Sequence, residues 1–287
     1  MRKLQGMTVA ITGASAGIGA TLARELARRG ARLALAARRR EKLEALNAEL
    51  TAKWGGGHLV VPCDVSIPDD CRRLVEETAS HFGRLDTFVA NAGYGLYRTV
   101  ADTSPQQARD LFATNVFGTI DCCTAAVAAM RRQEPRDGWR GQVMIVSSAA
   151  ARRGVPYLGV YCGTKAAQHM IAEAMRVELR PEGIAVTSVH PVMTTTDFGQ
   201  VAEEAGAIKL PRGNDFMTQT AEHVANRMAV AIAKPKAEVW PQRPARWALN
   251  LATFFPTLMD RGMKRYREQV DAFNRGGASG SSPTGGG

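Results

Sequence analysis

The sequence predicts an α/β fold, in which helices on both faces cover a doubly wound parallel sheet of about seven strands. Short, nearly continuous apolar runs alternate with longer amphipathic patterns, as expected when crossover helices join parallel strands. The chain has 287 residues, of which 45% are hydrophobic and 22% charged, enough to bury one large core. Residues 1 to about 275 contain no internal linker or repeat, so we expect a single domain.

The predicted elements alternate from the N-terminus onward. The strands are expected over residues 7–13, 32–38, 58–65, 85–93, 143–148, 184–191 and 237–241. The helices are expected over residues 20–30, 41–54, 69–83, 105–132 and 159–181. The basic start of the chain leads through a short apolar run into the first glycine turn, so we interpret it as the first strand and not as a signal peptide.

Beyond Pro241 the sequence predicts a helical extension from about residue 242, and a disordered Gly/Ser-rich tail over residues 276–287. The extension has large apolar residues followed by basic ones, and Pro256 interrupts its helical pattern. The apolar residues include Trp247, Leu251, Phe254, Phe255 and Leu258. We expect them to pack on the domain or to close a subunit interface, with an interfacial membrane helix as the alternative.

Composition argues against several functional classes. The formal net charge is +10, but the basic residues lie in separate blocks that also contain acids, so we expect no nucleic-acid partner. Five cysteines without a Cys-x-x-Cys spacing indicate reduced thiols, a cytoplasmic location and no metal site. The chain has no uninterrupted run of about eighteen apolar residues, so we expect no spanning helix.

A glycine turn follows the first predicted strand. In "TGASAGIG", Gly13, Gly17 and Gly19 stand between that strand and the next helix. Glycines allow a backbone to approach a pyrophosphate closely, and the helix N-terminus offers unpaired N–H groups and a positive dipole end. The turn therefore predicts a dinucleotide site in a Rossmann-like unit. A tight turn without a ligand is the alternative.

The residues after the second strand indicate which nucleotide is bound. An acid about twenty residues beyond the glycine turn would bind the ribose of NAD, but here Ala37 is followed by Arg38 and Arg39. Arginines at this place suit a 2′-phosphate, and Ser15 could add a hydroxyl donor. We therefore expect NADP(H) in preference to NAD(H). The alternative is that both arginines only begin a solvated helix.

In "YCGTK", a phenol and an ammonium group lie four residues apart. One helical turn separates Tyr161 from Lys165, so both side chains project from the same helix face. Two unit charges about 5 Å apart, at an effective dielectric constant near 20, interact by about 3 kcal/mol, or roughly two pKa units. Before any opposing desolvation, we therefore expect Lys165 to lower the pKa of Tyr161 toward neutrality. An ordinary surface pair would show the same spacing.

A serine pair supports the catalytic interpretation. Ser147 and Ser148 end the strand "VMIVSS", at the edge where open α/β sheets bind ligands. Together with the glycine turn, with "NAG" at residues 91–93 and with "YCGTK", they make the chain resemble the short-chain dehydrogenase/reductase family, classical type. The resemblance covers nearly the whole chain, and the order and spacing of these short motifs are specific.

The resemblance implies roles for individual residues. Tyr161 would be the general acid/base, Ser148 would hold the substrate oxygen, and Lys165 would lower the pKa of the tyrosine and bind the nicotinamide ribose. Asn115 would organise a proton-relay water beside the lysine, unless it is only a structural hydrogen-bonding residue. The cofactor-binding residues implied are Gly13, Ser15, Gly17, Ile18, Gly19, Arg38, Asp64, Val65, Asn91, Tyr161, Lys165 and Thr196. The alternative for Asp64 and Asn91 is that either only caps a turn. A homodimer or homotetramer through the helices that carry Asn115 and Tyr161 is also implied.

The chain departs from the family pattern in two places. After the sixth predicted strand, Val192 follows Pro191 where the family usually has glycine, which puts the local loop shape in doubt. The stretch between Asn115 and Ser148 is slightly long, and we assign the excess to the polar loop around Pro135.

The expected substrate is a small molecule with a hydrophobic body. Candidate pocket residues are mainly apolar, namely Tyr94, Leu96, Tyr157, Met193 and Phe198. Residues 194–215 are expected to form a mobile flap over them. The leading hypothesis is an NADP(H)-dependent oxidoreductase that interconverts a ketone or aldehyde and an alcohol. The alternative is a non-catalytic NADP-sensing or scaffold protein, with contact to a membrane surface through the C-terminal helices as a further option.

Overall fold

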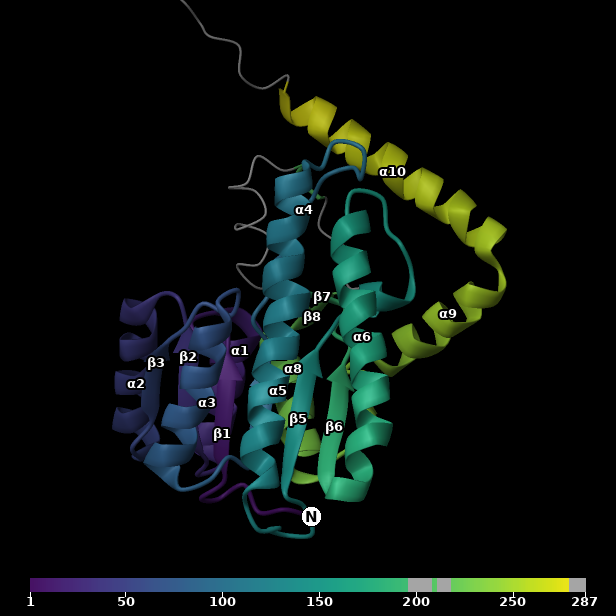
Figure 1. Ribbon diagram of the computed structural model, residues 1–287. Helices are drawn as coiled ribbons and strands as arrows, with labels where there is room; N and C mark the ends of the chain where they lie inside the picture. The colour runs from purple at the N-terminus through teal and green to yellow at the C-terminus, as the bar shows by residue number, and fades with distance from the viewer. Residues whose placement is uncertain (196–207, 211–217, 279–287) are drawn as a thin grey trace, which may run out of the picture.

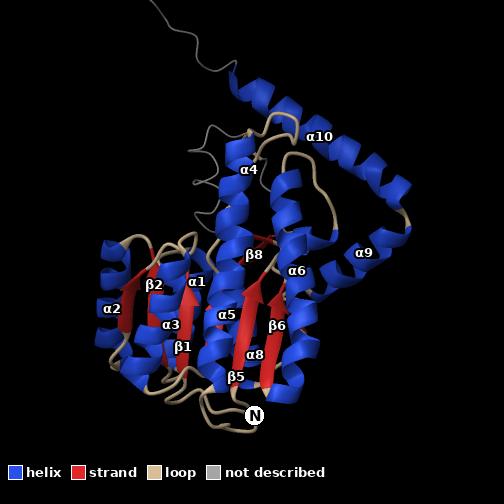
Figure 2. Ribbon diagram, viewed as in Figure 1, coloured by secondary structure: helices blue, strands red, loops and turns tan. Residues whose placement is uncertain are grey.

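The computed structural model describes residues 1–195, 208–210 and 218–278. Within these residues, seven parallel strands form one sheet in the order β3-β2-β1-β4-β5-β6-β9, which confirms the predicted doubly wound fold (Figures 1 and 2). The strands are β1 (Thr8–Thr12), β2 (Arg32–Ala37), β3 (Leu59–Pro62), β4 (Thr87–Ala90), β5 (Gly141–Val146), β6 (Ile184–Val189) and β9 (Glu238–Val239).

Helices cover both faces of this sheet. One layer consists of α1 (Gly17–Arg28), α2 (Arg40–Trp54) and α8 (Ala221–Ala233), and the other of α3 (Pro68–Phe82), α5 (Gly118–Arg131) and α6 (Gly159–Leu179). Successive residues of β1 face opposite layers, so Val9 and Ile11 pack with the first layer, whereas Ala10 packs with the second. Both faces of the sheet are thus buried, as its nearly continuous apolar strands predict.

The order of the strands reverses at β1. The chain places β2 and β3 on one side of β1 and then returns to pair β4 with the other side. Ligands of open α/β sheets bind beyond the carboxyl ends of the strands at such a reversal. A ligand site is therefore expected at the turn after β1 and the segment after β4.

The long helix predicted over residues 105–132 is interrupted. It consists of α4 (Pro105–Phe112), a π-helical turn, η1 (Ala113–Phe117), and α5. Such turns often lie at functional sites, and this one contains Asn115. The continuous helical segment Pro105–Arg131 is long and apolar enough to cross a membrane. Half of its most apolar window is buried in the domain, however, as in the core helix of a globular protein.

The C-terminal part crosses the carboxyl edge of the sheet (Figure 1). A short parallel pair, β7 (Met193–Thr195) and β8 (Thr218–Thr220), precedes α8. The chain ends in two helices, α9 (Arg243–Phe254) and α10 (Pro256–Ala278). The predicted disordered tail was to begin at residue 276, but α10 includes residues 276–278, and residues 279–287 lie outside the described part of the chain.

Candidate active site

The glycine turn after β1 requires glycine for two different reasons. Gly13 and Gly17 have φ angles of 67° and 54°, in the left-handed region that glycine adopts without strain. Gly19 allows a close approach of backbone to backbone, since a Cβ atom there would lie 2.4 Å from the carbonyl oxygen of Gly13. The turn and the first turn of α1 are thereby fixed against each other.

Asn91 supports this turn from the neighbouring strand β4. Its side-chain amide donates to the carbonyl oxygens of Thr12 and Gly13, at 2.9 and 3.4 Å. The Thr12 hydroxyl in turn accepts hydrogen bonds from the backbone N–H groups of Asn91 and Ala92 at 3.0 Å. The Asn91 amide is thus bound to the turn that would carry the cofactor, which is the alternative that the sequence left open for this residue.

The N-terminus of α1 is suited to an anion. Its N-cap residue, Ala16, offers no side-chain hydrogen bond, and the first turn contains no acidic residue, so N–H groups and the positive dipole end are available. At the end of β2, a guanidinium nitrogen of Arg39 donates to the Ser15 hydroxyl at 3.0 Å. The Arg38 guanidinium lies 4.0 Å from the Asp64 carboxylate. Arg39, which the predicted set of cofactor residues omitted, is thus the arginine that meets Ser15.

Asp64 and Val65 follow β3 at the same edge of the sheet. The Asp64 carboxylate accepts hydrogen bonds from the backbone N–H and the hydroxyl of Ser66, at 3.0 and 2.7 Å. The backbone of Val65 packs against Gly118, where a Cβ atom would come within 2.5 Å of the Val65 carbonyl oxygen. This loop is therefore held between the α3 and α5 layer and the end of the sheet.

Tyr161 and Ser148 meet at the carboxyl edge of the sheet. Ser148 follows β5 and caps the short helical turn η2 (Ala149–Arg152), where its hydroxyl accepts from the Ala150 N–H at 3.1 Å. Tyr161 lies in the first turns of α6 and is buried with Leu96 and Leu111. Burial raises the pKa of Tyr161, and a hydrogen bond with Ser148 lowers it. The Ser148 hydroxyl, which follows β5, and the Tyr161 hydroxyl on α6 are thus brought together.

Lys165 is buried one helical turn beyond Tyr161. Its Nζ atom lies 5.7 Å from the centre of the Tyr161 ring and donates to the Val146 carbonyl oxygen at 3.0 Å. Burial lowers the pKa of Lys165 from 10.5 to about 7. Desolvation disfavours the charged form of both groups, and it outweighs the effect of Lys165 that the sequence predicted, so the pKa of Tyr161 does not move toward neutrality in this structure. The net shift of the tyrosine pKa is upward.

Asn115 lies in the π-helical turn and is fully buried. Its side-chain oxygen accepts from the Tyr94 N–H at 3.1 Å, and its amide nitrogen donates to the Tyr94 carbonyl and the Thr164 hydroxyl at 3.0 and 3.1 Å. Its own carbonyl oxygen accepts from the Thr119 hydroxyl at 2.8 Å. Asn115 therefore connects the segment after β4 with α6, which it contacts at Thr164, three residues after Tyr161.

Gln168 completes this buried network, and the sequence interpretation missed it. Its Oε1 atom accepts from Lys165 Nζ at 2.8 Å, and its Nε2 atom donates to the Asn115 carbonyl oxygen at 2.6 Å. The same nitrogen also donates to the Thr119 hydroxyl at 2.8 Å. One amide thus bridges the lysine and the asparagine. The available signal was its position three residues after Lys165, which places both on one helix face.

The other predicted residues differ in outcome. Tyr94 and Leu96 pack with Tyr161 in one apolar cluster. The Tyr157 hydroxyl donates to the Asp271 carboxylate on α10, and Met193 is exposed on β7. Thr196, Phe198 and most of the predicted flap lie outside the described residues.

Val192 explains the departure from the expected Pro-Gly pair. Its side chain is buried in a cluster with Ala149, Trp240 and Ala245. The preceding Pro191 carbonyl oxygen accepts from the Ala149 N–H at 2.8 Å. Valine is therefore part of the contact between the loop after β6 and the start of α9, a contact that glycine could not make.

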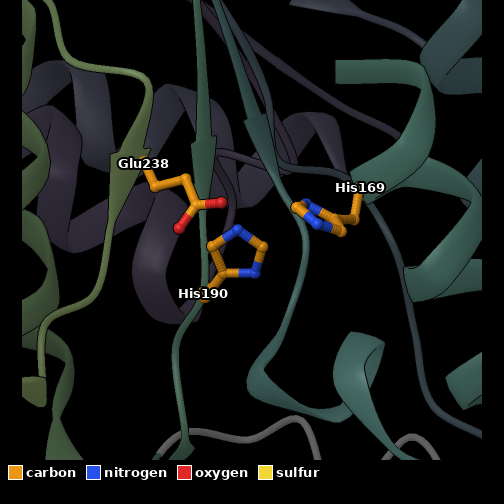
Figure 3. A group of neighbouring side chains, drawn as sticks. All are labelled: His169, His190 and Glu238. Carbon is orange, nitrogen blue, oxygen red and sulfur yellow. The ribbon is translucent and has the colours of Figure 1, made fainter. Parts of the chain in front are cut away.

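The buried His169 and His190 and the half-buried Glu238 form a group of neighbouring side chains (Figure 3). Its nearest ligand atoms are within 4.8 Å of one another. The Glu238 carboxylate accepts from Arg152 at 3.0 Å and lies 3.4 Å from Arg246. A divalent ion there would face two guanidinium groups at close range, so the group is poorly suited to hold a metal.

His190 instead holds the backbone of Ser148. Its Nδ1 atom donates to the Ser148 carbonyl oxygen at 3.3 Å, while Nε2 accepts from the Ser188 hydroxyl at 3.0 Å. The ring stacks on Trp240 with the centroids 4.5 Å apart. Burial lowers the pKa of His190 to about 4, so the ring stays neutral near pH 7 and keeps both hydrogen bonds.

Comparison with known proteins agrees with this geometry. The family described as short chain dehydrogenase matches residues 7–206. The 11-beta-hydroxysteroid dehydrogenase-like 3 protein of Arabidopsis thaliana is 32% identical over 263 residues, which cover 89% of this chain and 79% of that protein. A short chain dehydrogenase from Burkholderia cenocepacia J2315, solved in complex with NADP, has a TM-score of 0.71 at 26% identity and covers 83% of this chain and 97% of its own.

A further solved structure supports the fold alone. The short chain dehydrogenase from Mycobacterium paratuberculosis bound to NAD has a TM-score of 0.70 at 24% identity, over 84% of this chain and 98% of its own. Structural neighbours of the chain therefore include complexes with each of the two nucleotides.

Proposed function

The chain belongs to the short-chain dehydrogenase/reductase family and is an NAD(P)-dependent oxidoreductase of CH–OH and C=O groups, and on this premise we propose that it reduces a hydrophobic ketone or aldehyde with NADPH. The single observation that carries the proposal is the meeting of the Tyr161 and Ser148 hydroxyls next to the buried Lys165. They lie beyond the carboxyl ends of the central strands, where such sheets bind their ligands.

The residues present fit a dinucleotide phosphate. The glycine turn and the uncapped N-terminus of α1 would hold its pyrophosphate. Ser15 and Arg39, with Arg38 beside them, would hold the 2′-phosphate. When bound, the nicotinamide nucleotide supplies the hydride for the carbonyl carbon. The two arginines support a preference for the phosphorylated nucleotide, since hydrogen bonds to charged groups contribute about 1.5–3 kcal/mol each.

Tyr161 acts as the proton donor in this proposal. Burial raises the pKa of its phenol, so the hydroxyl stays protonated near neutrality and can give its proton to a substrate oxygen that gains negative charge. Ser148 donates a second hydrogen bond to the same oxygen. Its hydroxyl is positioned by the cap of η2 and by the backbone that His190 holds.

Lys165 supplies charge near the tyrosine. With a pKa of about 7, roughly half of the lysine side chains are charged at neutral pH. Any added acceptor near Nζ, such as a ribose hydroxyl, favours the charged form. A charged Lys165 stabilises the phenolate left after proton transfer, so the reductive direction is supported at low pH and weakens as the pH rises through the pKa of Lys165 in the complex.

The substrate is proposed to be apolar around its carbonyl group. Tyr94, Leu96 and Leu111 pack around Tyr161, and among the described residues of this cluster none is charged. The relative in Arabidopsis thaliana is named for a hydroxysteroid, which is consistent with an apolar substrate.

Association of subunits is also part of the proposal. Phe117 in η1 and Met170 and Val177 in α6 are exposed apolar residues on the helices that carry the site residues. A second copy of the chain would cover them through an isologous contact. Measurement of the mass of the protein in solution gives the number of subunits.

The proposed function is tested by NADPH oxidation with ketones and aldehydes of graded size. We expect turnover to rise with the apolar surface of the carbonyl compound. We also expect kcat/KM to be at least tenfold higher with NADPH than with NADH. Equal use of both nucleotides would overturn the preference, and the absence of turnover across the series would overturn the carbonyl substrate.

A further inference from the structure

The corner between α9 and α10, residues 243–265, exposes large apolar side chains. The exposed fractions are 74% for Trp247, 60% for Leu251, 78% for Phe254, 55% for Phe255 and 63% for Leu258. In α9 their spacing of four and three residues places them on one helix face. A contiguous patch of this kind marks an interaction surface.

The exposure does not arise from an undocked helix. On the inner side of α9, Ala245 and Leu249 pack with Ala149 and Trp240 of the domain. At the start of α10, Arg153 donates to the Pro256 carbonyl oxygen at 3.3 Å and pairs with Asp260. One side of the corner is therefore anchored, and the large apolar side chains are exposed on the other. The corner itself projects away from the sheet (Figure 1).

Basic residues flank the apolar patch in the sequence. Arg243, Arg261, Lys264 and Arg265 are exposed, and within the described residues none of the four has an ion-pair partner. Asp260, next to Arg261, is already paired with Arg153, and Glu268, three residues after Arg265, forms no ion pair within the described residues. The corner thus joins an apolar face with positive charge that neighbouring acids do not neutralise.

We propose that the α9–α10 corner binds the surface of an anionic phospholipid bilayer, with Trp247, Leu251 and Phe254 in the interfacial region. Apolar insertion and attraction to anionic headgroups together give reversible binding of amphipathic helices. A second copy of this chain fits less well. An isologous contact would set the same basic residues against one another, and like charges across an interface oppose association.

This surface lies next to the proposed active site. Arg153 and Tyr157, which α10 contacts through Asp260 and Asp271, belong to the segment between Ser148 and Tyr161. Binding through the outer face of the corner would bring the proposed active site close to the bilayer, from which an apolar carbonyl compound could reach it. That consequence rests on the proposed function, whereas the lipid binding itself does not.

Co-sedimentation with vesicles tests the proposal without any measurement of activity. We expect the full chain to pellet with vesicles of phosphatidylcholine and phosphatidylglycerol, and at least tenfold less with phosphatidylcholine alone. The bound fraction should fall as salt rises, because exposed charges are screened. A protein that stays in solution with both kinds of vesicle would overturn the proposal.

Two variants assign the binding to the corner. Trp247→Ser/Leu251→Ser/Phe254→Ser should reduce binding at least tenfold, whereas Trp54→Ser, at the end of α2, should bind like the wild type. If the triple variant pelleted like the wild type, the corner would not be the lipid site. If the triple variant had a lower mass in solution than the wild type, and the wild type bound no vesicles, the α9–α10 corner would be a contact between two copies of the chain.

The wild-type protein gives an independent readout if the triple variant fails to fold. Lipids brominated on their acyl chains should quench the fluorescence of the wild type, and Trp247→Phe should remove most of that quenching. Equal quenching in both proteins would place the contact elsewhere.

Discussion

Polar side chains usually lie at the surface of a protein and large apolar ones inside. Two regions of this chain depart from that rule in opposite ways, the buried network of Asn115, Lys165 and Gln168 and the α9–α10 corner. The network places an amine and two amides inside the domain, where each polar group needs a partner. The corner exposes large apolar side chains to solvent, where they make no contribution to the core. A buried charge and an exposed apolar face each cost stability, and each is informative for that reason.

The two regions differ in how they tolerate change. Each polar atom of the network has a partner of fixed geometry, such as the 2.6 Å bond from Gln168 to the Asn115 carbonyl oxygen, so removal of one group leaves others unpaired. Exposed side chains of the corner can be replaced at little cost to folding. Substitutions in the network should therefore change both chemistry and stability, and those in the corner only binding.

The largest effect is expected for Lys165→Met. Turnover should fall at least about 100-fold, because the phenolate loses its neighbouring charge. The folded pKa of Lys165 is about 7, below its usual 10.5, so below pH 7 the folded protein bears the full cost of the buried charge. That cost disappears as pH rises from 7 toward 10.5.

Unfolding in urea at two pH values checks this prediction. The variant should be more stable than the wild type at pH 6, by about 1–3 kcal/mol, and the difference should shrink at pH 9. The gain is limited because the Val146 carbonyl and Gln168 lose a hydrogen-bond partner. A gain that grows with pH would contradict the account of the network.

A smaller effect is expected at the nucleotide end of the site. Arg39→Ala should raise KM for NADPH about 10- to 30-fold, because one charge-assisted hydrogen bond is lost, and should leave KM for NADH nearly unchanged. Arg40→Ala is the matched control, since that arginine pairs with Glu44 on the surface of α2. Equal changes for both nucleotides would show that Arg39 does not recognise the phosphate.

The smallest effect is expected for Gln168, which acts through Lys165. Gln168→Leu should lower kcat about 3- to 10-fold. Gln168→Glu places a carboxylate beside Lys165 Nζ, raises the pKa of the lysine, and should move the fall of the reductive rate to higher pH by about one unit. Unchanged pH profiles in both variants would reduce Gln168 to a structural residue.

The cofactor half of the site could be predicted because its signals are local. Gly13, Gly17 and Gly19 lie within one turn and its helix, and the alternation of strands and helices places that turn at the reversal of strand order. The contact of Ser15 with Arg39, in place of Arg38, could not be predicted. It depends on the direction in which side chains leave the end of β2.

In the proposed catalytic half, the sequence predicted that Ser148, Tyr161 and Lys165 lie together, but not the direction of the tyrosine pKa. The spacing of Tyr161 and Lys165 gave their common helix face, but the direction of the tyrosine pKa depends on burial by Leu96 and Leu111, which are distant in sequence. The partner of Gln168, Asn115, lies 53 residues away. The π-helical turn that carries Asn115 could not be predicted, because it does not interrupt the helical pattern of the sequence.

The central claim is that the Tyr161 hydroxyl gives the proton to the substrate oxygen, and Tyr161→Phe tests it most directly. The phenyl ring keeps the packing with Leu96 and Leu111, so the fold should persist. We predict that kcat for carbonyl reduction falls at least about 100-fold, while the dissociation constant for NADPH stays within about twofold of the wild type. Turnover within tenfold of the wild type, at unchanged NADPH binding, would contradict the account.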